Sequence, residues 1–209
     1  GVQTCALPIL KVLLNGDWNE QSPLGKAEWI KFFGALYGLD AKAKTIFSTI
    51  EKEFQTTLAL AQKAKQKPSV LSGAMYQDQW FVPQGESWMA LFLKEAQSNY
   101  LWSKTTGTGS LSLPFETILE KAQKAEFWIA PGDFSSLQEM NNGNPHYAKF
   151  KAFQNKKVYS YAIHKGIKGG ILFFEWSSAR PDWVLKDLIA IFHPELVPQY
   201  TPHFFEKLN

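Results

Sequence analysis

Apolar residues recur at helical spacing over one long stretch in the first third of the chain. Between residues 41 and 65, Ile46, Ile50, Phe54 and Leu58 follow one another in steps of four, which places them on one face of an α-helix. Because no Pro or Gly interrupts this stretch, the pattern predicts a helix of about 25 residues, or about 37 Å. A helix of this length is a candidate for a rigid spine between two lobes, and the alternative is an ordinary amphipathic helix.

Short apolar segments alternate with amphipathic ones in the rest of the chain. Apolar runs bounded by turn residues predict strands, and stretches with helical periodicity predict helices. The predicted strands are 10–14, 69–74, 80–82, 127–130, 158–162 and 171–174, and the predicted helices are 26–37, 86–97, 113–125, 135–141 and 182–192. Strands that alternate with helices indicate an α/β fold with helices on both faces of a sheet.

Composition narrows the class of protein. The hydrophobic fraction of 45% and the charged fraction of 20% are ordinary for a globular domain with a core. A net charge of +3, with no basic run longer than two residues, argues against a nucleic-acid partner, and no apolar run approaches the ~20 residues of a membrane span. The aromatic fraction of 15% fits either a protein that holds a large flat or apolar ligand or an aromatic-rich core.

The first residues have the pattern of a foreign segment. Residues 2–9, VQTCALPI, are what a common short-read sequencing adapter gives when it is translated in one frame. We therefore expect residues 1–9 to be adapter-derived and Cys5 not to be native. The true N-terminus and any export signal would then lie outside this sequence. The alternative is a genuine strand that continues into residues 10–14.

Recognisable catalytic and metal-binding motifs are missing from the sequence. It contains no GxSxG, no Walker A motif and no GxGxxG. The histidines show no pairing at helical spacing; they are His146, His164, His193 and His203. We therefore expect no catalytic residue, no metal site and no cofactor.

Aromatic residues gather in the predicted loops rather than at periodic positions. Ligands of open α/β sheets bind beyond the carboxyl ends of the strands, where we expect these loops to lie. The predicted ligand contacts are Tyr76, Trp80, Phe81, Trp102, Trp176 and Arg180. Arg180 could pair with an anionic group of the ligand or could simply cap the neighbouring helix. The alternative for the aromatic residues is that half of them belong to the core.

Four strings give the chain a family resemblance. They are EQSPLGKAEWIKFFG at 20–34, WFVPQGESW at 80–88, LPFE at 113–116, and RPD through LKDLI and HP at 180–194. Together they resemble the solute-binding proteins of ABC importers for iron-siderophores and cobalamin, and most strongly the branch common in Bacteroidetes-type bacteria. In that class, two α/β lobes are joined by one long helix.

The resemblance implies a domain organisation. Residues 10–40 would be the end of an N-terminal lobe, residues 41–66 the interlobe helix, and residues 67–209 a Rossmann-like C-terminal lobe. Most of the N-terminal lobe would be absent, and we expect exposed apolar surface where it packed. The protein would be a monomer in the periplasm, or lipid-anchored on the outer face of the inner membrane.

The resemblance also implies a function without catalysis. The protein would capture an iron-siderophore or corrinoid-type ligand between its lobes and deliver it to the importer's permease. Glu28 and Glu116 match the glutamates with which this family docks onto the permease; the alternative is that each carboxylate only favours the first turn of a helix. Cobalamin binders of the class carry an aromatic residue shortly before the second glutamate. This chain has GTGS at 107–110, without an aromatic residue, which counts against cobalamin as the ligand. A haem carrier, or an α/β enzyme whose catalytic half is missing, are the competing interpretations.

Overall fold

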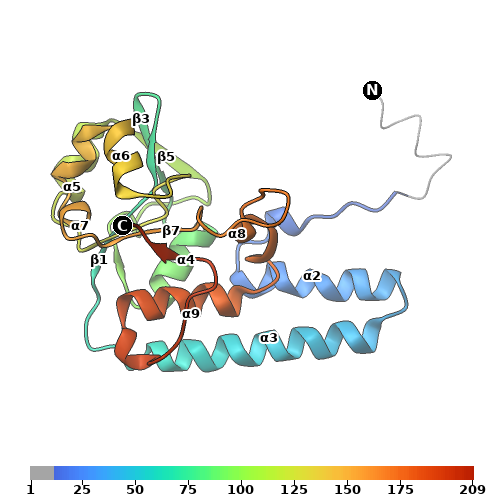
Figure 1. The fold of residues 1–209 in the computed structure, drawn as a ribbon. Coiled ribbons are helices and arrows are strands. Elements are labelled where there is room, and N and C mark those ends of the chain that lie inside the picture. Colours follow the sequence, from blue (N-terminus) through green and yellow to red (C-terminus); the bar gives the residue numbers. More distant parts are fainter. Residues whose placement is uncertain (1–11) are drawn as a thin grey trace.

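The computed structural model describes residues 12–209 (Figure 1). The expectations for residues 1–11, including Cys5 and the adapter-derived start, lie outside this range. Residues 12–14, predicted as the end of a strand, have no regular secondary structure, so that part of the prediction is wrong. A 3₁₀ turn, η1 (Asp17–Asn19), leads from this segment into the first helix.

A five-stranded sheet forms the centre of the fold. Its strands, in order across the sheet, are β4 (Asn99–Tyr100), β1 (Ser69–Ser72), β6 (Phe127–Ile129), β7 (Val158–Ser160) and β8 (Glu206–Lys207). The first four are parallel, and β8 pairs antiparallel to β7. The chain runs from β1 to β4 on one side and then crosses to β6 on the other side. Such a reversal of strand order is where open α/β sheets bind ligands.

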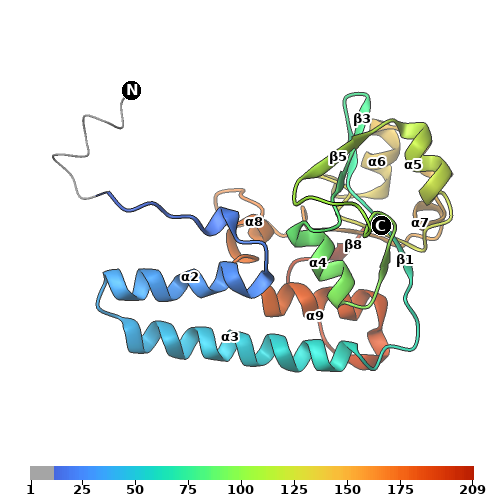
Figure 2. The ribbon, with the colours of Figure 1, turned by 180° about the vertical axis from the view of Figure 1, so that it is seen from behind.

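Helices cover both faces of this sheet, as the alternating pattern predicts. Figures 1 and 2 show α4 (Trp88–Glu95) and α9 (Pro181–Phe192) on one side of β1, with α5 (Phe115–Ala122) and α7 (Lys151–Gln154) on the other. The remaining helical elements are α2 (Pro23–Leu36), α3 (Asp40–Ala61), α6 (Leu137–Gly143), η2 (Pro145–Lys149), α8 (Leu172–Trp176) and η3 (Pro194–Leu196). Because both faces are covered, apolar side chains in the middle of the central strands are buried, with Val70, Leu71 and Ile129 at 0% exposure.

The long predicted helix is α3, which is one unbroken helix of 22 residues. It lies under α2 at one end and under α9 at the other, so it connects the α2 segment with the sheet unit (Figures 1 and 2). Its buried stripe includes Phe47, Ile50 and Phe54, whereas Ile46 is exposed. The predicted stripe was therefore shifted by one position at its start.

One predicted strand is a helix. The run 171–174 becomes part of α8 (Leu172–Trp176), which buries Phe173 and leaves Phe174 exposed. A short apolar run does not distinguish a buried strand from a short helix by periodicity alone. Trp176 therefore lies at the end of a helix and not, as predicted, at the end of a strand.

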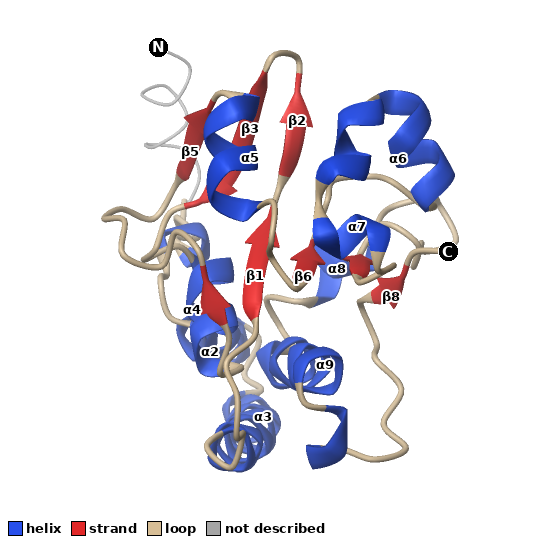
Figure 3. Cartoon of the chain, turned by 90° about the vertical axis from the view of Figure 1, so that its left-hand side faces the viewer, coloured by secondary structure: helices blue, strands red, loops and turns tan. Residues whose placement is uncertain are grey.

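A second, antiparallel sheet lies beyond the carboxyl end of β1 (Figure 3). It consists of β2 (Ala74–Tyr76), β3 (Gln79–Pro83) and β5 (Ser110–Leu113), in that order. Gln77, at the turn between β2 and β3, has a positive φ of 54°, which a two-residue hairpin turn requires. The hairpin carries its aromatic side chains to the edge of the main sheet.

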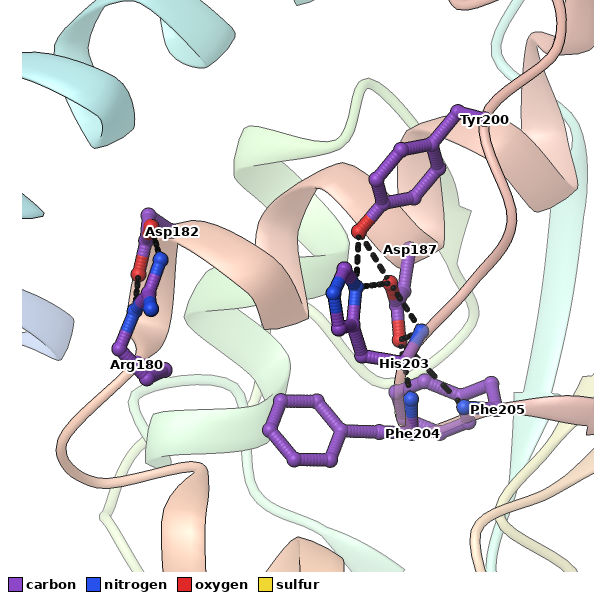
Figure 4. A network of polar contacts seen from close by, with 7 residues as sticks. All are labelled: Arg180, Asp182, Asp187, Tyr200, His203, Phe204 and Phe205. Carbon is purple, nitrogen blue, oxygen red and sulfur yellow. Dashed lines mark hydrogen bonds and ion pairs between the residues drawn. The ribbon is translucent and has the colours of Figure 1, made fainter.

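A buried carboxylate ties the C-terminal segment to α9 (Figure 4). Asp187 has no exposed surface and accepts a hydrogen bond of 2.7 Å from the Tyr200 hydroxyl. Its two oxygens also accept from the backbone N–H of His203 at 3.0 Å each, and Oδ2 accepts from that of Phe204 at 2.7 Å. These bonds fix residues 200–205 just before β8, so Asp187 holds the last strand in place.

Glu95, at the end of α4, is a half-buried acid with one buried oxygen that has no hydrogen-bond partner. Its Oε2 is inaccessible and makes no hydrogen bond within residues 12–209. Desolvation by burial, partly offset by the charge of Lys94, raises the pKa of Glu95 from 4.5 to about 7. The ionised side chain therefore destabilises the folded protein at neutral and alkaline pH.

Glu95→Gln should raise the stability at pH 8 and change it little at pH 5. Between pH 4.5 and about 7, the folded protein holds a proton on Glu95 that the unfolded chain has released. The contribution of this group to the free energy of unfolding thus falls as pH rises through that window. With allowance for its partial exposure to solvent, we expect a gain of about 1 kcal/mol at pH 8. Urea unfolding of both proteins at the two pH values measures this difference, and an equal effect at both would contradict the assignment.

Candidate functional site

A cavity of about 420 Å³ opens at the carboxyl ends of β1, β6 and β7. Figure 3 shows the β2–β3 hairpin on one side of these strand ends and α6 on the other. The lining residues are Gly73, Ala74, Met75, Tyr76, Phe81, Ala130, Pro131, Gly132, Asp133, Phe134, Glu139 and Tyr161. The cavity lies at the reversal of strand order, which is the position expected for a ligand site in this type of sheet.

Gly73 allows the hairpin to begin directly above β1. Its φ of +82° lies in the left-handed region, and a Cβ at this position would overlap the carbonyl oxygen of Phe81. Only glycine meets both conditions without a shift of the backbone. The indole N–H of Trp128 donates to the Gly73 carbonyl at 2.8 Å. This bond fixes the backbone of Gly73, which is one of the residues that line the cavity.

The loop after β6 has two residues in a left-handed conformation. Ala130 has a φ of 55° and Gly132 a φ of 94°, with Pro131 between them. A non-glycine residue with a positive φ is uncommon and carries a conformational cost of order 1–3 kcal/mol. The backbone N–H of Ala130 donates to the carbonyl of Tyr159 at 2.9 Å, which holds this strained residue at the end of the parallel ladder.

Aromatic side chains form two walls of the cavity. Tyr76 and Phe81 come from the hairpin, with ring centroids 6.4 Å apart, and they are 69% and 41% exposed. Phe134 and Tyr161 line the opposite part. Exposed aromatic rings around a concave surface are typical of sites for flat or apolar ligands.

The predicted contacts on the hairpin are therefore partly corrected. The structure places Tyr76 and Phe81 together in the cavity, but Trp80 points into the core with 0% exposure. Its ring packs against Trp128 at 5.1 Å between centroids, and its indole N–H donates to the Ser72 carbonyl at 3.1 Å. Since no part of Trp80 is accessible, it offers no surface to a ligand.

The prediction of Trp102 as a ligand contact is also wrong. It is 3% exposed and packs next to Tyr100, with Lys121 over its ring at 4.8 Å. It belongs to the core cluster around β1 and does not line the cavity. Trp102 is therefore one of the aromatic residues for which the alternative, a place in the core, is correct.

Arg180 and Trp176 lie outside the cavity lining as well. The Arg180 guanidinium pairs with both carboxylate oxygens of Asp182, at 2.9 and 2.6 Å (Figure 4), and stacks 3.5 Å above the Trp183 ring. Two of its donors, Nε and Nη2, are thus engaged within the protein, and its role as a partner for the ligand stays a prediction. Trp176 is 52% exposed at the end of α8 and lies parallel to Trp183. Only a ligand that extends from the cavity over α8 would reach it.

The two candidate docking residues are both exposed. Glu28 is on α2, where its carboxylate pairs with Lys31 at 2.7 Å, and Glu116 is in the first turn of α5. They lie on separate parts of the molecule, one on each side of α3 in the chain. Both positions are accessible to another protein, and docking stays a prediction for each.

Sequence reasoning missed Asp133, Phe134 and Glu139. A signal was present, because Pro131-Gly132 directly follows a predicted strand and so marks a tight turn at its carboxyl end. The acidic residues in and after that turn were not recognised as parts of the site. Within residues 12–209, no group of three His, Cys, Asp or Glu side chains could hold a metal ion.

Comparisons with known proteins identify a matching family and related sequences. The family model described as periplasmic binding protein matches residues 8–162. An uncharacterized lipoprotein of Methanocaldococcus jannaschii is 30% identical over 198 residues, which cover 93% of this chain and 45% of the relative. The chain spans about half the length of the curated relatives it matches. None of the helices in the described part of the chain has the length and apolar character needed to cross a membrane.

Solved structures share the fold at low sequence identity. A possible iron-binding, periplasmic solute-binding protein of Staphylococcus epidermidis superposes with a TM-score of 0.66 and 16% identity, over 92% of this chain and 70% of that one. The IsdE protein of Staphylococcus aureus, solved in complex with heme, gives a TM-score of 0.60 and 21% identity, over 83% and 66% of the two chains. These likenesses concern the arrangement of the elements.

Proposed function

The chain belongs to the periplasmic binding protein family, and we propose that it is the C-terminal part of the solute-binding component of an ABC importer. The family consists of binding proteins, not enzymes. The observation that carries the proposal is the aromatic cavity at the carboxyl ends of β1, β6 and β7, because ligands of open α/β sheets bind there. The protein would capture its solute at this cavity and release it to a permease.

In this proposal, residues 10–40 end an N-terminal lobe, residues 41–66 form the interlobe helix and residues 67–209 form the Rossmann-like C-terminal lobe. The length of the curated relatives, about twice that of this chain, supports a second lobe. The end of α2 and the turn after it also support it, since Phe33, Leu36 and Tyr37 are exposed there. Exposed apolar side chains in a row fit packing against a further part of the protein.

The proposed ligand is a ferric siderophore or a corrinoid, with haem as the alternative. A cavity of about 420 Å³ on one lobe, walled by aromatic rings, suits a large ligand that a second lobe covers from the other side. Neighbours described as possibly iron-binding and as complexed with heme support this range of ligands. Delivery would involve Glu28 and Glu116 as permease contacts, on the outer face of the membrane, in the periplasm or on a lipid anchor.

Removal of both hairpin aromatics tests the proposed site. In the full-length protein, that is, this chain with its proposed N-terminal lobe, Tyr76→Ala with Phe81→Ala should weaken ligand binding by roughly tenfold to a hundredfold, because two stacking surfaces are lost. Titration with cobalamin, haem and ferric siderophores, followed by tryptophan fluorescence, measures the affinity.

The same variant carries its own control. Both side chains are exposed, so the melting temperature should stay at the wild-type value. Saturable binding that the double variant leaves unchanged would place the ligand elsewhere. If the wild-type protein bound no member of the panel, the carrier function itself would be overturned.

A further inference from the structure

The lining of the cavity carries negative charge and no positive charge. Among its lining residues are two carboxylates, Asp133 and Glu139, and no Lys, Arg or His side chain. Both side chains are exposed, and an anionic ligand group placed here would lie close to two like charges with no cation among the lining residues. Such a juxtaposition is unfavourable, and more so where water is excluded.

Glu139 is held in its charged form in a fixed position. Its Oε2 accepts hydrogen bonds from the Ser135 backbone N–H and from the Ser135 hydroxyl, both at 2.8 Å. These two bonds lower the pKa of Glu139 below its ordinary value. Oε1 accepts no hydrogen bond from the residues that the structure describes, so one oxygen of a fixed anion stays available to a ligand.

Asp133 adds its charge from the loop after β6. Burial of Tyr161, with a smaller effect of the Asp133 carboxylate, raises the pKa of the Tyr161 hydroxyl above its ordinary value, and the ring is neutral at physiological pH. The two carboxylates therefore act with neutral aromatic rings. The faces of Tyr and Phe rings attract cations through their quadrupoles, so both kinds of lining residue favour the same sign of charge.

The cationic side chains of the described residues lie outside the lining of this cavity. Arg180 is paired with Asp182 at 2.6 Å, and His164 lies 3.5 Å from Glu206. Lys165 is an exposed residue whose charge reaches Glu139 through space, but it does not line the cavity. The lining of this cavity thus supplies no cationic partner for an anionic group of a ligand.

We propose that the part of the ligand held by this lobe is cationic or neutral, which favours a ferric hydroxamate chelate over a ferric catecholate or haem. The inference rests on the proposed function. Hydroxamate groups carry one negative charge each, so three of them leave ferric iron neutral, and a pendant ammonium makes the chelate cationic. Catecholate groups carry two charges each and leave the chelate strongly anionic, while haem carries two propionates.

Calorimetric titration of the full-length protein with chelates of different charge tests this inference. The probes are a ferric trihydroxamate with a pendant ammonium, a neutral ferric trihydroxamate and a ferric tris-catecholate. We expect the cationic chelate to bind most tightly and the tris-catecholate at least a hundredfold more weakly. Asp133→Asn with Glu139→Gln should weaken binding of the cationic chelate by roughly tenfold to a hundredfold. The ratio of the affinities for the cationic chelate and the tris-catecholate should therefore become smaller.

The outcomes separate this inference from the function on which it rests. Glu195→Gln is the matched control, because Glu195 is an exposed acid outside the cavity lining, and it should leave all affinities unchanged. Tighter binding of the tris-catecholate, or an unchanged affinity in the Asp133 and Glu139 double variant, would overturn the inference and leave the carrier function standing. If the panel that includes haem and cobalamin gave no binding at all, the proposed function would be overturned instead.

Discussion

Replacing Asp187 with Ala should lower the free energy of unfolding by about 3–5 kcal/mol. The carboxylate is fully buried and accepts hydrogen bonds from Tyr200, His203 and Phe204. Its removal leaves the backbone N–H groups of His203 and Phe204 without their acceptor, and each loss of that kind costs about 1–3 kcal/mol. The Tyr200 hydroxyl loses its bond to the carboxylate and keeps only its contact with His203 Nδ1 at 2.9 Å. We therefore expect the C-terminal strand β8 to detach from β7 before the rest of the sheet unfolds.

Two further variants make this test specific. Asp187→Asn keeps the shape and one acceptor oxygen, so it should cost less than Asp187→Ala. Asp78→Ala removes an exposed acid from the β2–β3 turn and should change the stability by less than about 0.5 kcal/mol. Urea unfolding followed by tryptophan fluorescence gives all three values. A loss below about 1 kcal/mol for Asp187→Ala would show that these hydrogen bonds do not hold the segment.

Gly73→Ala should destabilise the protein by about 3 kcal/mol and abolish ligand binding. The left-handed conformation alone costs about 1–2 kcal/mol for a residue with a Cβ, and the added methyl group would also overlap the Phe81 carbonyl. Because that oxygen belongs to the backbone of β3, relief of the overlap must displace the hairpin. The displacement would move Tyr76 and Phe81 away from the strand ends.

Gly169 provides the matched comparison for Gly73. Its φ of +84° is nearly the same, but nothing lies within 4 Å of the position that a Cβ would take. Gly169→Ala should therefore cost only the conformational term, about 1–2 kcal/mol, with ligand affinity unchanged. Thermal unfolding and ligand titration of both variants measure the difference. Equal losses of stability in the two would mean that the overlap with Phe81 is relieved without cost.

The large elements of the fold follow from the sequence because their apolar patterns are long. The stripe of α3 extends over several turns, and the strands around Val70 and Ile129 are short apolar runs between clear turn signals. The run at 171–174 is too short for its apolar period to distinguish a strand from a helix. Tertiary packing of Phe173 selects the helix. Which strands become neighbours is set by contacts far apart in the chain, which local patterns do not contain.

The site could be predicted in position but not in all of its residues. Trp80 and Phe81 are adjacent, and the alternation of β3 sends one side chain into the core and the other to solvent. The sequence alone does not tell which face is which, since both residues are aromatic. The left-handed conformation of Ala130 could not be predicted either. Its positive φ is imposed by the loop after β6, and alanine is not a residue type that indicates such a conformation.

In the proposed function, the solute is held at the carboxyl ends of β1 and β6. Hydrogen exchange of the full-length protein, with and without a saturating amount of the tightest-binding ferric chelate, tests it most directly. We expect exchange to slow at the backbone amides of residues 73–76 and 130–134, with no change in the segment around Trp102. Protection confined to residues outside these two segments would contradict it.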